Sequence, residues 1–412
     1  MESVYGVAGI DVHKTMLAVV IGIVEPQEIR WKKQRFGTTH SEIQRLSDWL
    51  AEQQVSEVAM ESTAQYWRPV WIALEGRFQL HLAQARSTTG PRGRKSDFAD
   101  AMRIVKRLLS ADLTLSYVPD AEQRRWRLLT RGRQQLIRDR VRLQSQLEGL
   151  LEEGQIKLSS VISNLLGSSG RRILKALAEG ESDPIRLAAL GDERLQASEE
   201  ALQEALRRQL QPLHRLLLRL HLERLEILDQ QIETLEQETV EAMRPHQDVI
   251  ARLCELPGLK MAAAQQILAE IGPQATAFPS AAQLASWIGV CPGRQESAGH
   301  SRSNRSAKGN RNLRQLLNQL AWSATKAKDS YLQILFRRLL PRLGVKKAIW
   351  AIAHRLARLI WKILHAGVHY IERGPLGLNE KALQRRKQML VRELRKLGYV
   401  VQVTPILPAP AV

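Results

Sequence analysis

The chain of 412 residues lacks the features that mark disulfide-rich and membrane-spanning proteins. Its two cysteines, Cys254 and Cys291, have no framework spacing and no metal-ligand partners near them in the sequence, so we expect thiols in a reducing compartment. No signal peptide opens the chain, and no long apolar run is free of charge. The nearest such run, residues 347–370, is interrupted by basic side chains. We therefore expect a soluble, cytoplasmic protein that has no membrane as a partner.

Acidic residues are scarce in the last part of the chain. Residues 294–412 contain 24 basic and five acidic side chains, whereas residues 1–120 contain 15 and 14 and residues 121–293 contain 22 and 23. The last region therefore carries the whole formal net charge of +19. A basic region of this size favours a polyanionic partner. A membrane surface is the competing interpretation, but no basic amphipathic anchor or lipidation signal supports it, and we expect nucleic acid.

Residues 1–118 alternate strand and helix signals, which predicts an α/β domain with a mixed sheet. Ser41 is a candidate cap for the first amphipathic helix, and Trp67 and Trp71 belong to a second one. A third helix is predicted over residues 99–109. Apolar and β-branched runs predict the strands at 4–12, 16–24, 28–36, 55–60 and 78–83.

Four acidic residues of this region occupy unusual places. Asp11 lies in an apolar strand, Glu61 ends another, and Asp97 and Asp100 stand three residues apart at the start of the last helix. Because like charges at this spacing repel, a shared cation explains the pair, and Mg²⁺ prefers a few carboxylates, waters and phosphates. The alternatives are acids that complement the helix macrodipole, or four unrelated surface acids. Asp11 argues against the latter, because a carboxylate among apolar neighbours needs a partner or a function.

Residues 119–245 lose the strand signal and predict a helical arm. Two long helices are expected, over 124–153 and 202–243, with leucines spaced by threes and fours. Pro212 is expected to kink the second helix near its start. Glycines and serines at 167–170 are expected to break the segment between them. The spacing fits an antiparallel arm, a dimerising coiled coil or an intramolecular hairpin, and does not choose between them.

Residues 246–345 combine a glycine turn with a basic loop. Leu256-Pro257-Gly258 before a helix at 262–271 resembles a helix-hairpin-helix element, whose backbone N–H groups bind phosphate. Ser297 lies among small residues that allow a close approach of a ligand, although a serine in such a loop is more often a phosphate contact or a solvated hydroxyl than a nucleophile. Residues 346–412 are expected to form a basic helical extension and a disordered tail. The candidate nucleic-acid contacts are Lys95, Arg294, His300, Arg302, Arg305, Lys308, Arg311 and Arg314.

An ordered set of motifs runs along the chain. They are GIDVHK at 9–14, MEST at 60–63, GRKSDFADA at 93–101, LPG at 256–258 and ESAG at 296–299. The order of the acids resembles the RuvC type of RNase H-like fold, and the whole set resembles the DEDD transposases of the IS110 family. These are recombinases of bacterial insertion sequences that use a bridge RNA. His300 departs from the family pattern, where Lys or Arg is more usual.

The resemblance implies an architecture and a chemistry. It implies a RuvC-like catalytic domain (1–118), a coiled-coil arm (119–245), a helical transposase domain (246–345) and the C-terminal extension (346–412). Mg²⁺ would be held by the four acids, and Ser297 would be the nucleophile. The expected partners are donor and target DNA, a structured guide (bridge) RNA and further copies of the chain in a homodimer or homotetramer, in which the active site forms across protomers. The set of acids as metal-binding and catalytic residues is Asp11, Glu61, Asp97 and Asp100.

Three functions are consistent with these residues. The first is an RNA-guided recombinase that attacks DNA with Ser297. The second is a RuvC-type endonuclease that uses metal-activated water and does not need Ser297. The third is a nucleic-acid-binding protein without catalysis. The retention of all four acids argues against the third, and the resemblance favours the first.

Overall fold

The structure is a computed structural model, and it describes residues 5–62, 64–84, 96–192, 195–293, 295–297, 300–303, 305–372, 374 and 380–403. The chain divides into two compact units, Met1–Pro119 and Asp120–Val412, which are described separately. Among the described residues, every helix is too short or too polar to cross a membrane.

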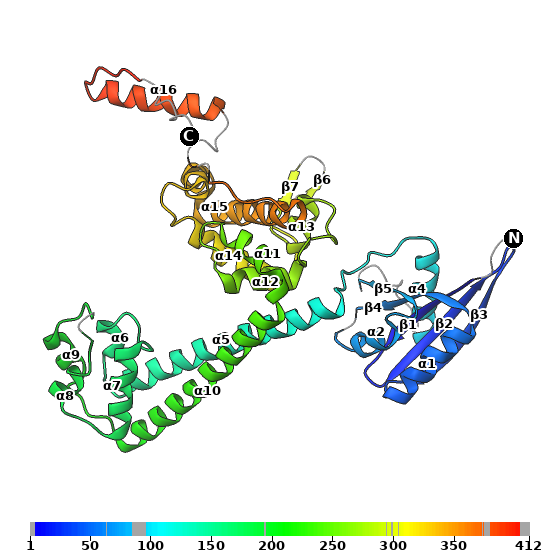
Figure 1. The fold of residues 1–412 in the computed structure, drawn as a ribbon, viewed down its shortest axis with the longest axis horizontal. Helices are drawn as coiled ribbons and strands as arrows, with labels where there is room; N and C mark the ends of the chain where they lie inside the picture. Colours follow the sequence, from blue (N-terminus) through cyan, green and yellow to red (C-terminus); the bar gives the residue numbers. More distant parts are fainter. Residues whose placement is uncertain are drawn as a thin grey trace. The chain divides into compact units, whose positions relative to one another are not determined.

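The first unit is built on a five-stranded mixed sheet in the order β3-β2-β1-β4-β5 (Figure 1). β1 pairs antiparallel with β2 and parallel with β4, β2 pairs antiparallel with β3, and β4 pairs parallel with β5. Together with its helices this sheet makes an α/β domain with a mixed sheet, as the sequence predicts. The strands are β1 (Tyr5–Val12), β2 (Met16–Val24), β3 (Ile29–Gly37), β4 (Val55–Glu61) and β5 (Gln79–Ala83).

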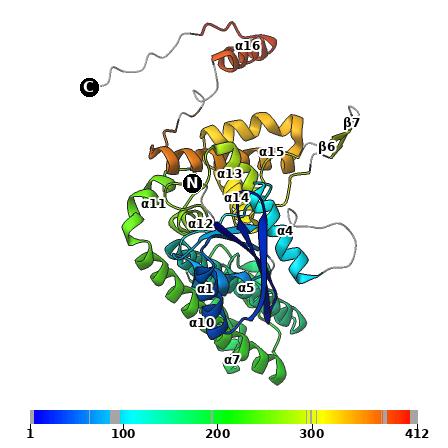
Figure 2. The ribbon, with the colours of Figure 1, turned by 90° about the vertical axis from the view of Figure 1, so that its right-hand side faces the viewer.

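Helices cover both faces of this sheet. α1 (His40–Glu52) and α2 (Trp67–Leu74) share a hydrophobic core with alternate residues of the strands, including Ile10. α4 (Asp97–Leu109) lies on the opposite side of the sheet from α1 (Figure 2). It approaches β1 so closely that a Cβ atom on Gly9 would lie 2.4 Å from the Ala101 carbonyl oxygen. Because side chains alternate along a strand, Gly9 and Asp11 share the face that α4 covers.

In the second unit, the arm is an antiparallel pair of helices within one chain, α5 (Ala121–Glu153) and α10 (Pro212–Ala242). Ion pairs cross it in antiparallel order: Arg125 Nη2 lies 3.8 Å from Glu238 Oε2, and Arg140 Nε lies 2.6 Å from Asp229 Oδ1. The predicted start of the second helix at 202 is wrong. Pro212 does not kink that helix but begins it, at the position where a missing N–H costs nothing.

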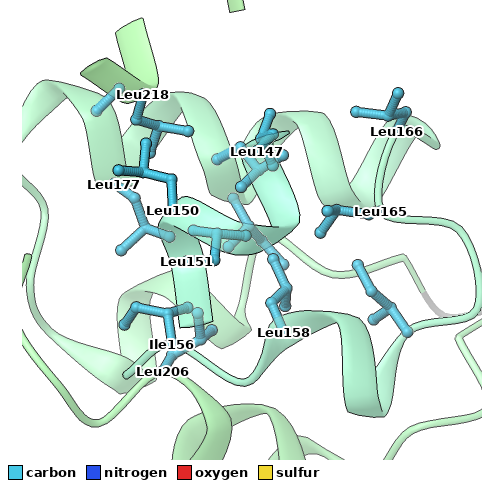
Figure 3. Close-up of a cluster of buried hydrophobic side chains, with 14 of the residues drawn as sticks. Leu147, Leu150, Leu151, Ile156, Leu158, Leu165, Leu166, Leu177, Leu206 and Leu218 are labelled. Carbon is cyan, nitrogen blue, oxygen red and sulfur yellow. The ribbon is translucent and has the colours of Figure 1, made fainter. Parts of the chain in front are cut away.

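Four short helices pack around the C-terminal end of α5 and the N-terminal part of α10. They are α6 (Leu158–Val161), α7 (Ser168–Glu179), α8 (Pro184–Ala188) and α9 (Glu199–Ala205). Their shared core includes Leu147, Leu151, Leu177 and Leu218 (Figure 3). The predicted break at 167–170 is instead the start of α7. A Cβ atom on Gly170 would lie 2.1 Å from the Leu165 carbonyl oxygen, so glycine permits the contact that begins this helix.

In the part of the second unit that the structure describes, the remaining elements are helices and the β6–β7 hairpin. α15 bends at Gly344, whose φ of 71° is outside the helical region. Its second half buries Ile349, Ile352 and Leu356, so this part of the helix packs into the core, whereas the sequence predicts an extension from residue 346 onward. The elements are η1 (Arg244–His246), α11 (Gln247–Cys254), α12 (Met261–Ile271), α13 (Ala281–Ile288), β6 (Gln295–Ser297), β7 (His300–Ser303), α14 (Arg311–Ala324), α15 (Tyr331–Ala366) and α16 (Glu380–Lys396).

The helix α16 corrects a second expectation about this end of the chain. Its sequence is basic and amphipathic, with Leu390, Leu394 and Leu397 more than two-fifths exposed at or just beyond it. None of the α16 side chains that the structure describes is buried. A basic amphipathic element is therefore present, contrary to the sequence-based expectation.

Candidate active site

The carboxylate of Asp11 is placed by the alternation of β1. Its neighbours Ile10 and Val12 are buried in the core that α1 and α2 share, so Asp11 points to the α4 face. Ile10 is paired with Met60 of β4, and Glu61 is the next and last residue of that strand. The side chain of Asp11 is only 15% exposed. A carboxylate at this depth requires a charged or hydrogen-bonding partner.

The partner is a cluster at the end of β1 and the start of α4. Asp11 Oδ2 lies 3.1 Å from His13 Nε2, which lies 3.6 Å from Asp97 Oδ1. One ligand atom from each of the three residues lies within 4.8 Å of the others. Arg35 of β3 adds a cation, with Nη2 3.6 Å from Asp97 Oδ2 and its guanidinium 5.1 Å from the Phe98 ring. Two carboxylates and an imidazole therefore converge on one point.

The electrostatics of Asp11 show that negative charge is concentrated here. Burial raises the pKa of this carboxyl above its ordinary value, and the charges of Asp100 and Asp97 raise it further. The charge and hydrogen bond of His13 act in the opposite direction without cancelling the rise. A divalent cation would relieve this repulsion, and the carboxylate oxygens fit the hard-ligand preference of Mg²⁺. The residues therefore fit a divalent metal.

The four predicted acids are not equivalent in the structure. Asp11 and Asp97 belong to the converging group. Asp100 lies near enough to raise the pKa of Asp11, but its Oδ1 accepts a hydrogen bond from Arg103 Nη1 at 2.5 Å. Glu61 ends β4 next to β1 and is not a member of the group. The structure thus brings two of the four acids together and leaves the other two beside them.

His13 is the residue that sequence-based reasoning missed. In the sequence it stands out only as part of the motif at 9–14, without a role of its own. Its backbone N–H donates to the Met16 carbonyl oxygen at 2.9 Å, which closes the tight β1–β2 connection and turns the imidazole back toward Asp11. The available signal was its position two residues after Asp11, on the same side of the chain.

Ser297 lies on the β6–β7 hairpin, where it is paired with His300. Figures 1 and 2 show this hairpin standing out from the helices of the second unit. The structure describes the backbone of Ser297, His300 and Arg302 but not their side chains, and Arg294 and Lys95 lie outside the described residues. Their predicted roles in catalysis and nucleic-acid binding stay predictions.

The base of the hairpin is held by close backbone contacts. We call residues 289–293 and 305–310 the hairpin stem. A Cβ atom on Gly309 would lie 2.4 Å from the Ile288 carbonyl oxygen, and one on Gly293 would lie 2.1 Å from that of Arg305. Glycine at both positions lets the two sides of the stem pack together. The hairpin therefore leaves the helical body from a fixed base.

Arg314, one of the predicted nucleic-acid contacts, makes internal contacts in the structure. Arg314 donates to the Ala307 carbonyl oxygen at 2.7 Å and to Ser306 Oγ at 2.8 Å, and its guanidinium lies 4.8 Å from the Trp350 ring. These contacts give it a structural role that the sequence did not predict. Arg305, Lys308 and Arg311 are exposed.

The glycine turn between α11 and α12 also packs internally. Gly258 has a φ of +79°, and a Cβ atom on it would lie 2.6 Å from Ser323 Oγ. Close packing against α14 therefore accounts for glycine at this position. The predicted phosphate contact of this turn stays a prediction.

Comparisons with known proteins add the following. The RuvC structure from Thermus thermophilus matches at 15% sequence identity with a TM-score of 0.23, covering 27% of this chain and all of that one. The T. thermophilus RuvC in complex with a Holliday junction substrate matches at 15% identity with a TM-score of 0.22, covering 27% of this chain and 99% of that one. No curated protein sequence matches the chain.

Two family models match the sequence. Residues 8–155 match the DEDD transposase domain of the IS110 type, described as a transposase. Residues 250–335 match the model described as transposase, IS116/IS110/IS902 family. The first match contains the whole Asp11–His13–Asp97 cluster, and the second contains the hairpin of Ser297. The chain therefore carries a DEDD transposase domain of the IS110 family and, after its helical arm, a transposase domain of the IS116/IS110/IS902 family.

Proposed function

We propose that the protein is the transposase of an insertion sequence and that it cleaves and exchanges DNA strands under the guidance of a structured RNA. The observation that carries the proposal is the convergence of Asp11 and Asp97, from β1 and α4, inside the region that matches the DEDD transposases. Two carboxylates that are distant in the sequence repel each other when the fold brings them together. A metal-dependent phosphoryl-transfer site would explain why the fold does so.

The acids have the first role in the proposed mechanism. Asp11 and Asp97 would hold Mg²⁺, and Asp100 and Glu61 would complete the set of acids. When bound, the ion supplies positive charge that neutralises the oxygens of the phosphodiester under attack. His13 orients the Asp11 carboxylate through its hydrogen bond, and Arg35 holds Asp97 and adds positive charge for the DNA backbone.

Ser297 has the second role. Its Oγ forms a bond to phosphorus as the bond from phosphorus to the 3′ oxygen breaks, which leaves a 5′-phosphoserine and a free 3′ hydroxyl. The proton that leaves the serine is balanced by the one that the 3′ oxygen takes up. Because the ester keeps the bond energy, a 3′ hydroxyl of another strand reseals the DNA by the reverse reaction without an external energy source.

We infer the partners of the protein from the charge of its last region and from its resemblance to the IS110 transposases. The excess positive charge of residues 294–412, with Lys308 and Arg311 exposed at the start of α14, suits DNA and RNA phosphates. The structured bridge RNA would pair with donor and target DNA. A homodimer or homotetramer would let the serine of one copy serve the acids of another.

The experiment that tests this function is a recombination assay with donor and target plasmids. The protein is supplied with and without RNA transcribed from the non-coding DNA that flanks its gene. The proposal expects recombinant junctions only when both the protein and the RNA are present. Recombination at equal efficiency without the RNA would contradict RNA guidance, and cleavage without any strand exchange would favour a RuvC-type nuclease that uses water.

A further inference from the structure

Glu270 is a fully buried carboxylate at the end of α12, with 0% of its surface exposed. Arg131 of α5 donates to both of its oxygens, from Nε at 2.7 Å and from Nη2 at 2.8 Å. Asn310 Nδ2 donates at 2.8 Å, and Asn312 Nδ2 lies 3.4 Å away. One side chain thus joins the helical arm, α12 and the start of α14.

This carboxylate stays ionised in spite of its depth. Burial by itself would raise the pKa of Glu270, but the hydrogen bonds and charges of Arg131, Arg127 and Asn310 lower it below the ordinary value. Taking a carboxylate and a guanidinium out of water costs free energy. Apolar residues of similar volume in their place often give a fold that is equally stable or more stable. A buried ionic pair here is therefore better explained by the specific geometry it imposes than by stability alone.

On one side the network fixes the base of the arm. Arg127 donates from Nε to the Ala269 carbonyl oxygen at 3.0 Å and from Nη2 to the Glu270 carbonyl oxygen at 2.7 Å. Gln123 Nε2 also donates to the Ala269 carbonyl oxygen at 3.0 Å. Side chains from the first turns of α5 therefore satisfy carbonyls that the end of α12 leaves unpaired.

On the other side the network fixes the hairpin stem. Asn310 is the last residue of the stem, and its backbone N–H donates to the Trp287 carbonyl oxygen at 3.1 Å. Its Oδ1 accepts the N–H of Leu313 at 3.0 Å and so caps α14, while its Nδ2 binds Glu270. A single amide thus sets the start of α14 and ties the stem to the buried carboxylate.

We infer that Glu270 is a positioning residue for the β6–β7 hairpin. Through Asn310 it holds the stem, and through Arg131 it fixes the position of the stem relative to the base of the arm. A displacement of the arm base moves Arg131 and therefore the carboxylate that anchors the hairpin. The link to catalysis rests on the proposed function of Ser297; the link between Glu270 and the stem does not.

The test uses Asn310→Ser in the full-length protein. Serine is as good a helix cap as asparagine, so α14 keeps its cap while the hydrogen bond to Glu270 is removed. Asn312→Ser is the matched control, because it makes the same change at the weaker contact to the same carboxylate. Glu270→Gln is the second test variant, since it removes the charge and keeps the shape.

Two quantities are measured for each variant. The first is hydrogen exchange at the stem amides, which we expect to be about tenfold faster in Asn310→Ser and Glu270→Gln, the equivalent of removing one hydrogen bond to a charged group. The second is the rate of covalent protein–DNA adduct formation at saturating DNA, which we expect to fall by a similar factor while the DNA affinity of Asn310→Ser stays unchanged. Asn312→Ser should match the wild type in both.

The outcomes separate the two claims. Unchanged stem exchange in both Asn310→Ser and Glu270→Gln would overturn the positioning role. So would faster exchange of equal size in Asn312→Ser, because it would show a general loosening of α14. If the wild type forms no adduct, the proposed function of Ser297 fails, and the exchange measurement alone decides the role of Glu270.

Discussion

Gly9 and Asp11 lie on the same face of β1, and that face is the one that α4 covers. The missing side chain of Gly9 lets the Ala101 backbone approach the strand, and this approach brings the start of α4 and Asp97 to the Asp11 carboxylate. The converging acids thus depend on a glycine two residues earlier. Close packing of this kind couples the fold of the first unit to its proposed chemistry.

The proposed metal site predicts a ligand-dependent gain in stability. Millimolar Mg²⁺ should raise the melting temperature of the wild type, because a ligand that binds only the folded state stabilises it. Asp11→Asn and Asp97→Asn should lose this response and all recombination while keeping nucleic-acid binding. Asp112→Asn, at an exposed position of the same unit, is the control and should respond like the wild type. An undiminished response in Asp11→Asn would contradict the assignment.

The buried Glu270 predicts a specific acid sensitivity. Because its folded pKa lies below the ordinary value, its contribution to stability is complete above that value and is lost as the pH falls through the folded pKa. Denaturant unfolding between neutral and acid pH should therefore be less pH-dependent in Glu270→Gln than in the wild type. Glu236→Gln, which breaks the exposed pair with Arg133, serves as the comparison. A pH profile of Glu270→Gln parallel to that of the wild type would exclude a lowered pKa.

The core at the far end of the arm predicts a large effect of one substitution. Leu147 is 0% exposed among the leucines of α5, α7 and α10. Leu147→Ala should lower the free energy of unfolding by about 3 kcal/mol, because apolar burial is reduced and a cavity is left behind. Leu128→Ala on the same helix, where the side chain is 69% exposed, should change it by less than about 0.5 kcal/mol. Chemical denaturation measures both, and equal effects would contradict this packing.

Much of the fold was predictable because local sequence patterns determine its helices and strands. The apolar and β-branched runs of β1 and β2 and the leucine spacing of α5 and α10 depend only on neighbours along the chain. The side chain of Asp11 was predictable as unusual for the same reason, since its neighbours Ile10 and Val12 are apolar.

Other features depend on contacts between distant residues and leave no periodic signal. Gly170 resembles a helix breaker until the Leu165 carbonyl oxygen is seen beside it. The second half of α15 is basic in sequence, yet it buries Ile352 and Leu356, because long cationic side chains leave one face of the helix apolar. The network of Glu270 joins residues of three separate elements, which no local pattern could reveal.

The revised limits of the core predict which basic segment can be removed. A chain that ends at residue 374 lacks α16 but keeps every described buried side chain, whereas one that ends at 341 lacks the core half of α15. If α16 binds phosphates, its removal should flatten the log–log dependence of DNA affinity on salt by about 0.9 for each duplex phosphate that α16 neutralises. Fluorescence anisotropy over a salt series measures the slope. An unchanged slope would show that α16 serves another purpose.

The most direct test of the account is the covalent bond between Ser297 and DNA. The wild type, bound to its RNA and incubated with end-labelled substrate in Mg²⁺, should yield a protein–DNA adduct that survives denaturation and is mapped to a 5′-phosphoserine at position 297. Ser297→Ala should bind RNA and DNA but form no adduct and no recombinant, while Ser303→Ala, in the same hairpin, should behave like the wild type. Normal cleavage by Ser297→Ala, with no covalent species in the wild type, would show that water is the nucleophile and would contradict the account.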